Sequence, residues 1–260
     1  MAKNSNENVE ARRKHILEVI LQDGETEITD LASRLEVSTM TIRRDVDELI
    51  ERKMLQKASV GTIKLAESFE VDPGYVKRHI LNQSEKTLIG MEAAKLIHDD
   101  MVLGFDASTT TMEVTKHLSS VQNITVVTNG LLIPQYLATH PSLNLEMAGG
   151  KVRGEALSTV GTRTCRVLSR YNYDIVFVSV NAVDAKYGLS DTSEEEIETK
   201  LALLKNATTR VLLVDSGKIG KRAYCKCGDI SDVDIIITDK GTRQEDIDAF
   251  LEHNVKVIIA

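Results

Sequence analysis

Residues 38–46, which read S-T-M-T-I-R-R-D-V, constrain the fold of this chain more than any other segment. Ser38 is suited to cap a helix, because its hydroxyl can accept a hydrogen bond from an amide in the first turn. Apolar residues then recur at helical spacing, at Ile42, Val46, Leu49 and Ile50. Residues 28–35 predict a preceding short helix capped by Thr29, and the turn at Glu36 is too short for antiparallel helices. The pattern therefore predicts two helices that cross steeply, as in a helix-turn-helix.

The second helix has a polar face suited to DNA. At about 100° per residue, Met40, Thr41 and Arg44 lie opposite the apolar face and Arg43 lies on its flank. Arginine pairs with guanine edges in the major groove and also holds phosphates. A solvated face carrying two arginines by chance is the alternative, but the cap, the apolar period and the neighbouring elements favour DNA binding. The residues predicted to contact DNA are Ser38, Thr39, Met40, Thr41, Arg43, Arg44 and Lys57.

The elements around this motif predict a winged helix. A helix is expected over residues 9–22, and residues 55–57 and 62–65 flank Ser59-Val60-Gly61 as a hairpin. Residues 1–65 hold 11 Lys and Arg against 12 Asp and Glu, a net charge of −1. A DNA-binding module is usually basic, so the charge here has to be sorted by face. The basic residues on elements expected to approach DNA are Arg12, Arg13, Arg43, Arg44, Lys57 and Lys64.

Composition points to two domains without a membrane anchor. The chain has 260 residues with 42% apolar content, enough for two cores. Its first residues are polar, and no later apolar run approaches membrane-spanning length, so we expect a cytoplasmic protein. Three cysteines, Cys165, Cys225 and Cys227, fit neither a disulfide framework nor zinc-site spacing, and ordinary thiols are expected. We expect no metal and no cofactor.

A linker is predicted over residues 66–83, between a DNA-binding domain (1–65) and a second domain (84–260) whose first helix Ser84 would cap. Short runs rich in Val, Ile and Leu alternate with helical stretches there. The runs are 101–106, 124–127, 143–147, 175–180, 211–215, 235–238 and 255–259, and the helices include 110–118, 131–139, 194–206 and 243–253. Such alternation predicts an α/β domain, with a mostly parallel sheet and helices on both faces.

Ligands bind at the carboxyl ends of strands in such sheets. The first run ends at Asp106 and leads into Ser108, Thr109, Thr110 and Thr111 at a helix start, where hydroxyls and free amides suit a phosphate. Ordinary helix capping is the alternative reading. Asp106 would then accept sugar hydroxyls. Further candidates for effector binding follow the other runs, and together they suit a small anionic polyol: Asn129, Gly149, Gly150, Arg153, Lys200 and Lys218.

From about Ala11 to Ala260 the chain resembles the DeoR family of bacterial regulators. The resemblance rests on these motifs: Ser38-x-x-Thr41-Ile42-Arg43-Arg44-Asp45, Asp106-x-Ser108-Thr109-Thr110-Thr111, Thr128-Asn129, Gly149-Gly150-x-x-Arg153, Gly188-Leu189, Lys200 and Asp215-Ser216-x-Lys218. It implies a sensor domain similar to ribose-5-phosphate isomerase that binds a phosphorylated sugar, usually in a repressor of a sugar-utilisation operon. By this analogy Ser108 to Thr111 take the phosphate, and Asp106, Asn129, Arg153, Lys200 and Lys218 surround the sugar.

Three positions depart from the family pattern. The wing reads Ala58-Ser59-Val60-Gly61 where relatives usually have a His-Gly-Gly run, so its DNA contact is open. Asn181 stands where relatives commonly have Asp, which bears on the choice of effector. Glu36 takes a turn position that is often Gly, and a non-glycine residue there is expected to be strained.

The leading interpretation is a repressor that leaves its DNA operator when a phosphorylated sugar binds, acting as a homo-oligomer, a dimer or a tetramer. The alternative is a sugar-phosphate isomerase with an appended DNA-binding domain, since fold does not fix function. Isomerisation needs a base, for which Asp106 and Asp184 are candidates. Asn181 removes a carboxylate from a strand end where a base would be useful, and this favours a regulator. Activation and repression stay open at this point.

Overall fold

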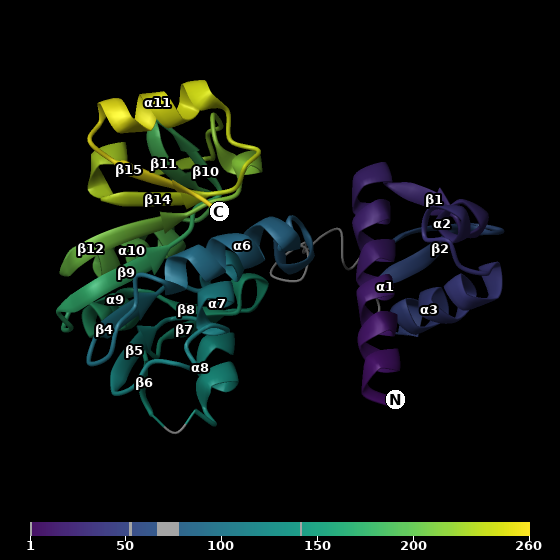
Figure 1. Ribbon diagram of the computed structural model, residues 1–260, viewed down its shortest axis with the longest axis horizontal. Helices are drawn as coiled ribbons and strands as arrows, with labels where there is room; N and C mark the ends of the chain where they lie inside the picture. Colours follow the sequence, from purple (N-terminus) through teal and green to yellow (C-terminus); the bar gives the residue numbers. More distant parts are fainter. Residues whose placement is uncertain (1, 52–53, 67–77, 141) are drawn as a thin grey trace. The chain divides into compact units, whose positions relative to one another are not determined.

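The computed structural model describes residues 2–51, 54–66, 78–140 and 142–260. It divides into two compact units, Met1–Leu81 and Asn82–Ala260 (Figure 1). Most of the predicted linker, residues 67–77, lies outside the described residues. The end of that segment is divided between the units, because Ile80 is buried in the core of the first unit while Asn82 begins the second.

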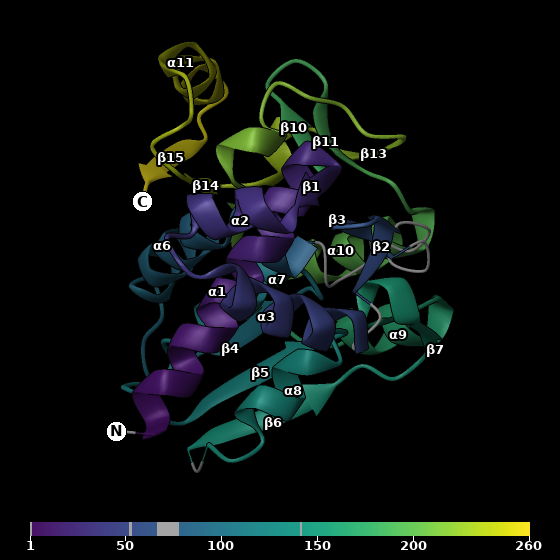
Figure 2. The same ribbon diagram turned by 90° about the vertical axis from the view of Figure 1, so that its right-hand side faces the viewer.

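The first unit is a winged helix-turn-helix. Its helices are α1 (Ala2–Asp23), α2 (Ile28–Arg34) and α3 (Thr39–Glu51), and its strands are β1 (Glu25–Glu27), β2 (Leu55–Ser59) and β3 (Thr62–Leu65). Strands β2 and β3 form the predicted hairpin, and the unpredicted β1 pairs with β3 as a third antiparallel strand (Figure 2). The apolar face of α3, with Ile42, Val46 and Leu49, is buried in the core of this unit.

Local contacts explain how α2 and α3 begin. The Thr41 amide donates to the Ser38 hydroxyl at 3.1 Å, so the predicted cap of α3 is confirmed. The predicted cap of α2 is wrong: Glu27 is the N-cap residue, and Thr29 lies inside the helix with its hydroxyl 3.2 Å from the Glu27 carboxylate. Glu36 in the turn has a φ of 53°, a left-handed conformation that costs a residue with a Cβ about 1–2 kcal/mol.

The second unit contains a seven-stranded sheet in the order β15-β14-β12-β9-β4-β5-β6, in which every pair is parallel. Each strand corresponds to a predicted apolar run. The strands are β4 (Val102–Phe105), β5 (Ile124–Thr128), β6 (Leu143–Met147), β9 (Tyr173–Val178), β12 (Ala207–Leu213), β14 (Ile235–Thr238) and β15 (Lys256–Ile259). These strands have the alternation with helices that the sequence predicts, and the α/β fold class is confirmed.

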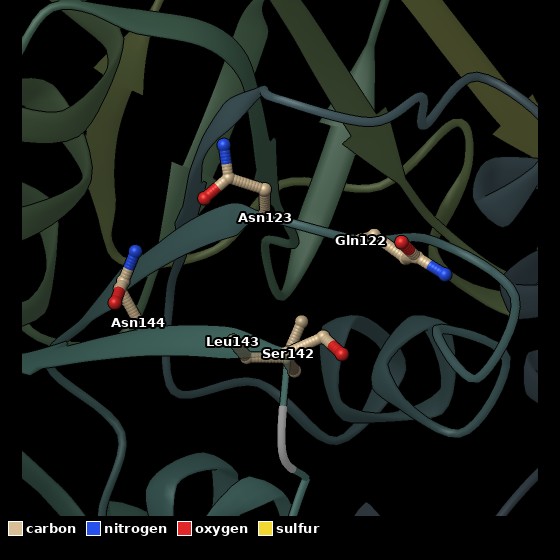
Figure 3. A pocket seen from close by; sticks show the side chains of 5 residues that line it. All are labelled: Gln122, Asn123, Ser142, Leu143 and Asn144. Atoms are coloured by element: carbon tan, nitrogen blue, oxygen red, sulfur yellow. The ribbon is translucent and has the colours of Figure 1, made fainter.

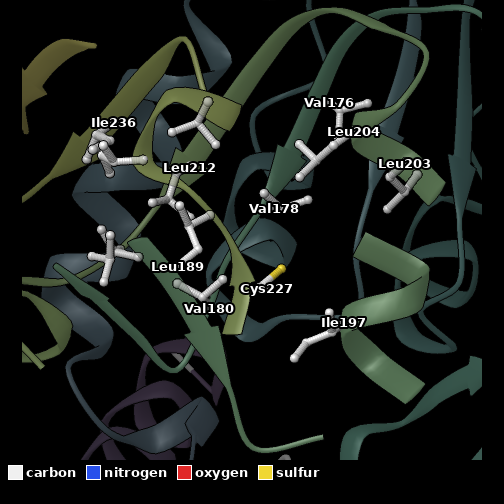
Figure 4. Close-up of a cluster of buried hydrophobic side chains, with 14 of the residues drawn as sticks. Val176, Val178, Val180, Leu189, Ile197, Leu203, Leu204, Leu212, Cys227 and Ile236 are labelled. Carbon is white, nitrogen blue, oxygen red and sulfur yellow. The ribbon is translucent and has the colours of Figure 1, made fainter. Parts of the chain in front are cut away.

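Helices cover both faces of this sheet and bury two apolar cores. One core involves α6 (Gln83–Ala94), α7 (Thr109–Thr115) and α8 (Leu132–Leu137). There the rings of Phe105 and Phe177, from adjacent strands, stack with centroids 5.2 Å apart. The other core lies beneath α9 (Thr162–Leu168), α10 (Glu194–Leu204) and α11 (Gln244–Glu252), where Val176, Val178 and Leu203 are buried (Figure 4).

Several short elements were not predicted. A hairpin joins β7 (Lys151–Arg153) to β8 (Ser158–Val160), and a small antiparallel sheet contains β10 (Ala182–Asp184), β11 (Gly188–Asp191) and β13 (Cys225–Gly228). Three 3-10 turns, Gly154–Ala156, Ser216–Lys218 and Ile230–Asp232, complete the unit. Ser84 does not cap α6: Asn82 is the N-cap residue, in a left-handed conformation, and the Ser84 hydroxyl bonds to Glu85. Among the described helices, none has the length and apolar content needed to cross a membrane.

Candidate DNA-binding and effector-binding sites

Helix α3 presents the predicted DNA-contacting side chains on its solvent face. Thr39, Met40, Arg43 and Arg44 are exposed, whereas Thr41 is half-buried, with its hydroxyl 2.9 Å from that of Ser38. The same helix buries Ile42, Val46 and Leu49 on its other side. The helical projection made from the sequence is therefore confirmed in its burial pattern, and a major groove could be approached by this face.

A groove of about 670 Å³ separates this helix from the wing. Arg43 and Asp47 of α3 line one side, and Lys57, Val60 and Gly61 of the hairpin line the other. The fold thus brings together Arg43 and Lys57, two residues predicted for DNA binding from segments well apart in the sequence. Two cations at the edges of one groove are suited to hold phosphate oxygens.

Arg12 and Arg13 do not belong to this surface, contrary to the sequence-based expectation. Their guanidinium groups reach from α1 to Asp45 of α3, at 2.6 and 3.1 Å, and Asp45 is buried. An aspartate that is buried needs such partners, because an unpaired charge away from water is costly. The two arginines therefore attach α1 to the recognition helix.

In the second unit, Asp106 at the end of β4 is buried and fully hydrogen-bonded. One carboxylate oxygen accepts from the Ser108 amide at 3.0 Å and the Thr111 hydroxyl at 2.9 Å. The other accepts from the Ser179 amide at 3.1 Å and the Lys200 ammonium at 2.6 Å. Burial would raise the pKa of Asp106, but Lys200 and these amides outweigh it and hold the pKa below the ordinary value. Asp106 therefore organises the strand end from within the protein.

Lys200, on α10, is the cation at the centre of this cluster. Its ammonium lies 2.6 Å from Asp106 and 3.8 Å from Asp191 at the end of β11. Burial alone would lower the pKa of Lys200, but attraction by Asp106, Asp191 and Glu196 outweighs it and raises the pKa. The Asn181 amide donates to Asp191 at 2.8 Å, so this departure from the family pattern takes part in the same network.

Lys218 is the least neutralised cation of the cluster. Its ammonium donates to the Ser179 hydroxyl at 3.2 Å, and its nearest carboxylate, Asp215, is 4.0 Å away. Burial lowers the pKa of Lys218, and Lys200 lowers it further, while Asp215 and more distant carboxylates only partly compensate. A partly buried cation with this balance of charges is suited to receive an anion.

The hydroxyl-bearing loop has two kinds of side chain. Ser108 caps α7 by accepting from the Thr111 amide at 3.0 Å, and the Thr111 hydroxyl bonds to Asp106, so both serve the protein itself. Thr109 and Thr110 are also buried, and the Thr110 hydroxyl has no hydrogen-bond partner among the described residues. The same holds for the side-chain oxygen of buried Asn129, although its amide nitrogen donates to the Thr159 carbonyl at 3.0 Å. A buried polar atom without a partner costs about 1–3 kcal/mol, which a ligand could recover.

The third strand end contributes a glycine pair and an arginine. Gly149 has open space around its Cα, whereas a Cβ on Gly150 would lie 2.0 Å from the Thr164 hydroxyl, so the backbone requires glycine there. Arg153 is already paired with Glu155 at 2.8 Å and with Glu196 at 3.5 Å. The arginine would have to exchange one of these partners to bind a ligand.

Some residues of this cluster were missed from the sequence. Ser179 and Asp191 were not predicted, although Asp191 closely follows the Gly188-Leu189 motif. Asn82 was also missed: its amide donates to Asp215 at 2.8 Å, which links the start of α6 to the strand end beside Lys218. No pattern of spacing could have found Asn82, because it lies far from Asp215 in the sequence.

A separate hollow of about 330 Å³ lies at the opposite edge of the sheet. Its lining comes from the segments that begin β5 and β6, and Figure 3 shows these side chains: Gln122, Asn123, Ser142, Leu143 and Asn144. No residue predicted for effector binding lines it. In the part of the chain that the structure describes, no group of His, Cys, Asp and Glu side chains could hold a metal ion.

Comparison with known proteins gives two family matches. Residues 12–69 match the model of the DeoR-like helix-turn-helix domain, and residues 81–240 match that of the DeoR C terminal sensor domain. The chain is 31% identical over 248 residues to an HTH-type transcriptional regulator of Haemophilus influenzae, covering 95% of this chain and 96% of the relative. It is 27% identical over 246 residues to the glycerol-3-phosphate regulon repressor of Escherichia coli K12, covering 95% and 97%.

A putative aga operon transcriptional repressor of Escherichia coli O157:H7 is 26% identical over 250 residues, covering 95% of this chain and 93% of the relative. Among solved structures, a D-ribose-5-phosphate isomerase in complex with phospho-erythronic acid matches 53% of this chain and 54% of its own, with 19% identity and a TM-score of 0.40.

Proposed function

The chain belongs to the DeoR family of transcriptional regulators and carries its DNA-binding domain; from this premise we propose that it represses an operon for the use of a sugar or a related polyol, and that a phosphorylated metabolite releases it from DNA. Relatives named as repressors of the glycerol-3-phosphate regulon and the aga operon support this proposal. A regulator of this kind acts on chromosomal DNA, and we expect it in the cytoplasm.

The observation that carries the effector class is the state of Lys218. Among the residues that the structure describes, its ammonium has one hydroxyl partner and no carboxylate closer than 4.0 Å, and burial lowers the pKa of Lys218. A phosphate oxygen would supply the missing negative charge through a charge-assisted hydrogen bond, which a neutral sugar cannot form. The unpartnered oxygens of Thr110 and Asn129 provide further polar positions at the same carboxyl edge of the sheet. We therefore propose a small phosphorylated polyol as the ligand.

Asn82 offers a route from this site to the DNA-binding unit. Its amide bonds to Asp215, whose carboxylate is the nearest to Lys218. Residue 82 is also the N-cap of α6, the first helix after the segment that joins the two units. If Lys218 moves towards a bound phosphate, the Asp215 carboxylate loses its nearest cation. The hydrogen bond from Asn82 to Asp215 would then change in strength. Ligand binding weakens DNA binding only if the affinity for the ligand differs between the DNA-bound and the free protein. The corresponding coupling free energy is commonly about 1–3 kcal/mol.

The enzyme alternative has little chemical support. A base for isomerisation should be free to take a proton, but Asp106 accepts hydrogen bonds on both oxygens and its pKa is held low. Asp184 accepts from the amides of Lys186 and Tyr187, at 2.9 and 3.0 Å, in the turn between β10 and β11. Neither carboxylate is arranged as a base, and we expect no turnover of phosphorylated pentoses or hexoses.

A thermal-shift screen tests the effector. Phosphorylated sugars and polyols, each paired with its unphosphorylated form, are added to the full-length protein, since a ligand at 100 times its Kd adds about 2.7 kcal/mol to stability. We expect a rise in Tm with phosphorylated compounds alone, and its loss in Lys218→Met and Thr110→Val. Lys221→Met is the matched control, because Lys221 is exposed on the same loop. A response retained in both Lys218→Met and Thr110→Val would exclude this site.

We also propose that the repressor binds DNA as a dimer or a larger oligomer. One recognition helix contacts too few base pairs to select a genomic site, and two-fold related half-sites supply the rest. Sedimentation of the protein with a duplex that holds one half-site tests this: a monomer bound at full affinity would contradict it.

A further inference from the structure

The turn between β2 and β3 is held in one conformation by its neighbours. Gly61 has a φ of 85°, a region that favours glycine, and the Ser59 hydroxyl donates to the Thr62 hydroxyl across the turn at 2.9 Å. The Ile28 amide at the start of α2 donates to the Gly61 carbonyl at 2.9 Å. The tip of the wing is therefore a fixed part of the DNA-binding unit.

Val60 at this tip is fully exposed and is not part of the apolar core of the unit. Its residue is 104% exposed, so the side chain is covered by nothing in the structure. Turn positions favour Gly, Pro, Asn, Asp and Ser, and a β-branched residue gains nothing there. The turn itself is explained by Ser59, Gly61 and Thr62 without it. A lone exposed apolar side chain is common on protein surfaces, and its meaning depends on what lies beside it.

Beside Val60 is the surface that binds DNA. Val60 lines the same groove as Arg43 of the recognition helix and Lys57 of the wing. Lys57 is exposed on the strand that leads to the tip, so a duplex held by Arg43 and Lys57 would come close to Val60. The turn Ser59-Val60-Gly61 carries no charged side chain, so Val60 itself can form no ion pair with a phosphate.

We propose that Val60 is a DNA-contacting residue that packs its methyl groups against the apolar part of the duplex, the deoxyribose carbons and the base edges, next to the site read by α3. The contact releases no counterions, so its share of the affinity is independent of salt, unlike that of Lys57. Apolar contact with the thymine methyl group is one of the ways in which a side chain reads a base edge in the major groove. The inference rests on the DNA-binding part of the proposed function and requires no effector.

The test is a salt series with a duplex selected in vitro by the wild-type protein. Affinity is measured by fluorescence anisotropy from about 50 to 200 mM salt, where the slope of log K against log salt counts the phosphates neutralised. For Val60→Ala we expect a three- to tenfold loss of affinity at every salt concentration, with an unchanged slope. For Lys57→Ala, the matched control on the same hairpin, we expect a slope smaller by about one.

A second variant tests proximity without relying on a loss. Val60→Lys places an ammonium at the tip, and we expect its slope to increase by about one if the tip reaches the duplex. Both changes are on the exposed tip, and an unchanged Tm will verify that the unit still folds. Unaltered affinity in Val60→Ala would overturn the apolar contact, and an unaltered slope in Val60→Lys would overturn the placement of the tip beside the duplex. Failure of the wild-type protein to select any duplex would instead refute DNA recognition itself.

Discussion

Each of the two units contains a buried aspartate that is paired with one or more cations, but the pairing differs between the units. In the DNA-binding unit, Asp45 is held by Arg12 and Arg13, whose side chains remain 21% and 17% exposed. In the second unit, called the sensor unit from here on, Asp106 is paired with Lys200, whose side chain is only 6% exposed. The contacts of Asp45 join α1 and α3 near water. The Asp106–Lys200 ion pair lies within the cluster at the strand ends. Removing a cation should therefore have very different effects in the two units.

The cations intended for ligands also differ. Arg43, Arg44 and Lys57 are exposed, as suits a polymer that approaches from outside. Lys218 is partly enclosed and lies against Ser179, as suits a small molecule that enters the protein. Water solvates Arg43, Arg44 and Lys57 well, so their charges cost almost no stability. It reaches Lys218 less well, so the charge of Lys218 reduces the stability of the folded protein.

The largest effect is expected for Lys200→Met. It leaves the Asp106 carboxylate buried without its cation, and breaking a buried pair costs about 3–5 kcal/mol. Urea unfolding followed in the sensor unit measures the loss. Lys205→Met, an exposed position at the end of the same helix, should change little. The double variant Lys200→Met/Asp106→Asn should recover part of the loss, and a loss below about 1 kcal/mol in the single variant would contradict this account.

Asp45→Ala should have an intermediate effect. It frees Arg12 and Arg13, which can turn towards water, so only hydrogen bonds to a charged group are lost, about 1.5–3 kcal/mol. Thermal unfolding of the DNA-binding unit provides the measurement. Asp47→Ala is the control, because Asp47 is exposed on the same helix and surface changes usually stay within about 0.5 kcal/mol. Equal losses in the two variants would show that the arginine contacts do not hold the helix.

Arg44→Ala should weaken operator binding by about 1–3 kcal/mol while leaving the effector-induced rise in Tm unchanged. The exposed guanidinium takes no part in the core, so stability should not fall. Arg34→Ala tests whether loss of any arginine suffices, because Arg34 lies on α2 and pairs with Asp23 and Asp30. Operator affinity that survives Arg44→Ala at physiological salt would remove α3 from the major groove.

The smallest effect, and one of opposite sign, is expected for Lys218→Met. The pKa of Lys218 is lowered, so its charged form is disfavoured by folding, and the methionine variant should be slightly more stable than wild type at pH 7. The difference should shrink as the pH rises from the lowered pKa towards the ordinary lysine value, where the unfolded chain also loses the proton. Urea unfolding at several pH values measures it. A variant less stable than wild type would mean that Asp215 outweighs burial.

Sequence patterns predicted the seven strands of the parallel sheet and most of the longer helices, because these segments contain apolar runs or apolar residues at helical spacing, but they missed short strands such as β7 and β10. The departures are local. Thr29 and Ser84 were read as caps from residue type alone, but Glu27 and Asn82 are the N-cap residues. Helix starts depend on backbone angles that residue type does not fix, such as the φ of 51° at Asn82.

The sensor site shows the same limit in its chemistry. From the sequence we predicted that Asp106, Lys200 and Lys218 lie at one edge of the sheet, because parallel strands end on the same side. It did not reveal that Asp106 and Lys200 neutralise each other, or that Arg153 is paired with Glu155 and Glu196. Which charges remain available is decided by side-chain packing between segments far apart in the chain, and spacing carries no information about it.

The strand order has a consequence for how the chain is made. The first strand of this sheet to be synthesised, β4, lies in its interior; β5 and β6 extend it on one side, and β9, β12, β14 and β15 extend it on the other. Each new strand therefore pairs with one already synthesised, and none has to be inserted between two existing neighbours. Assembly can keep pace with translation, in the order in which domains and their parts emerge. Strand β15, the last of these strands in chain order, adds only an edge, so the interior strands already have their partners when it is synthesised.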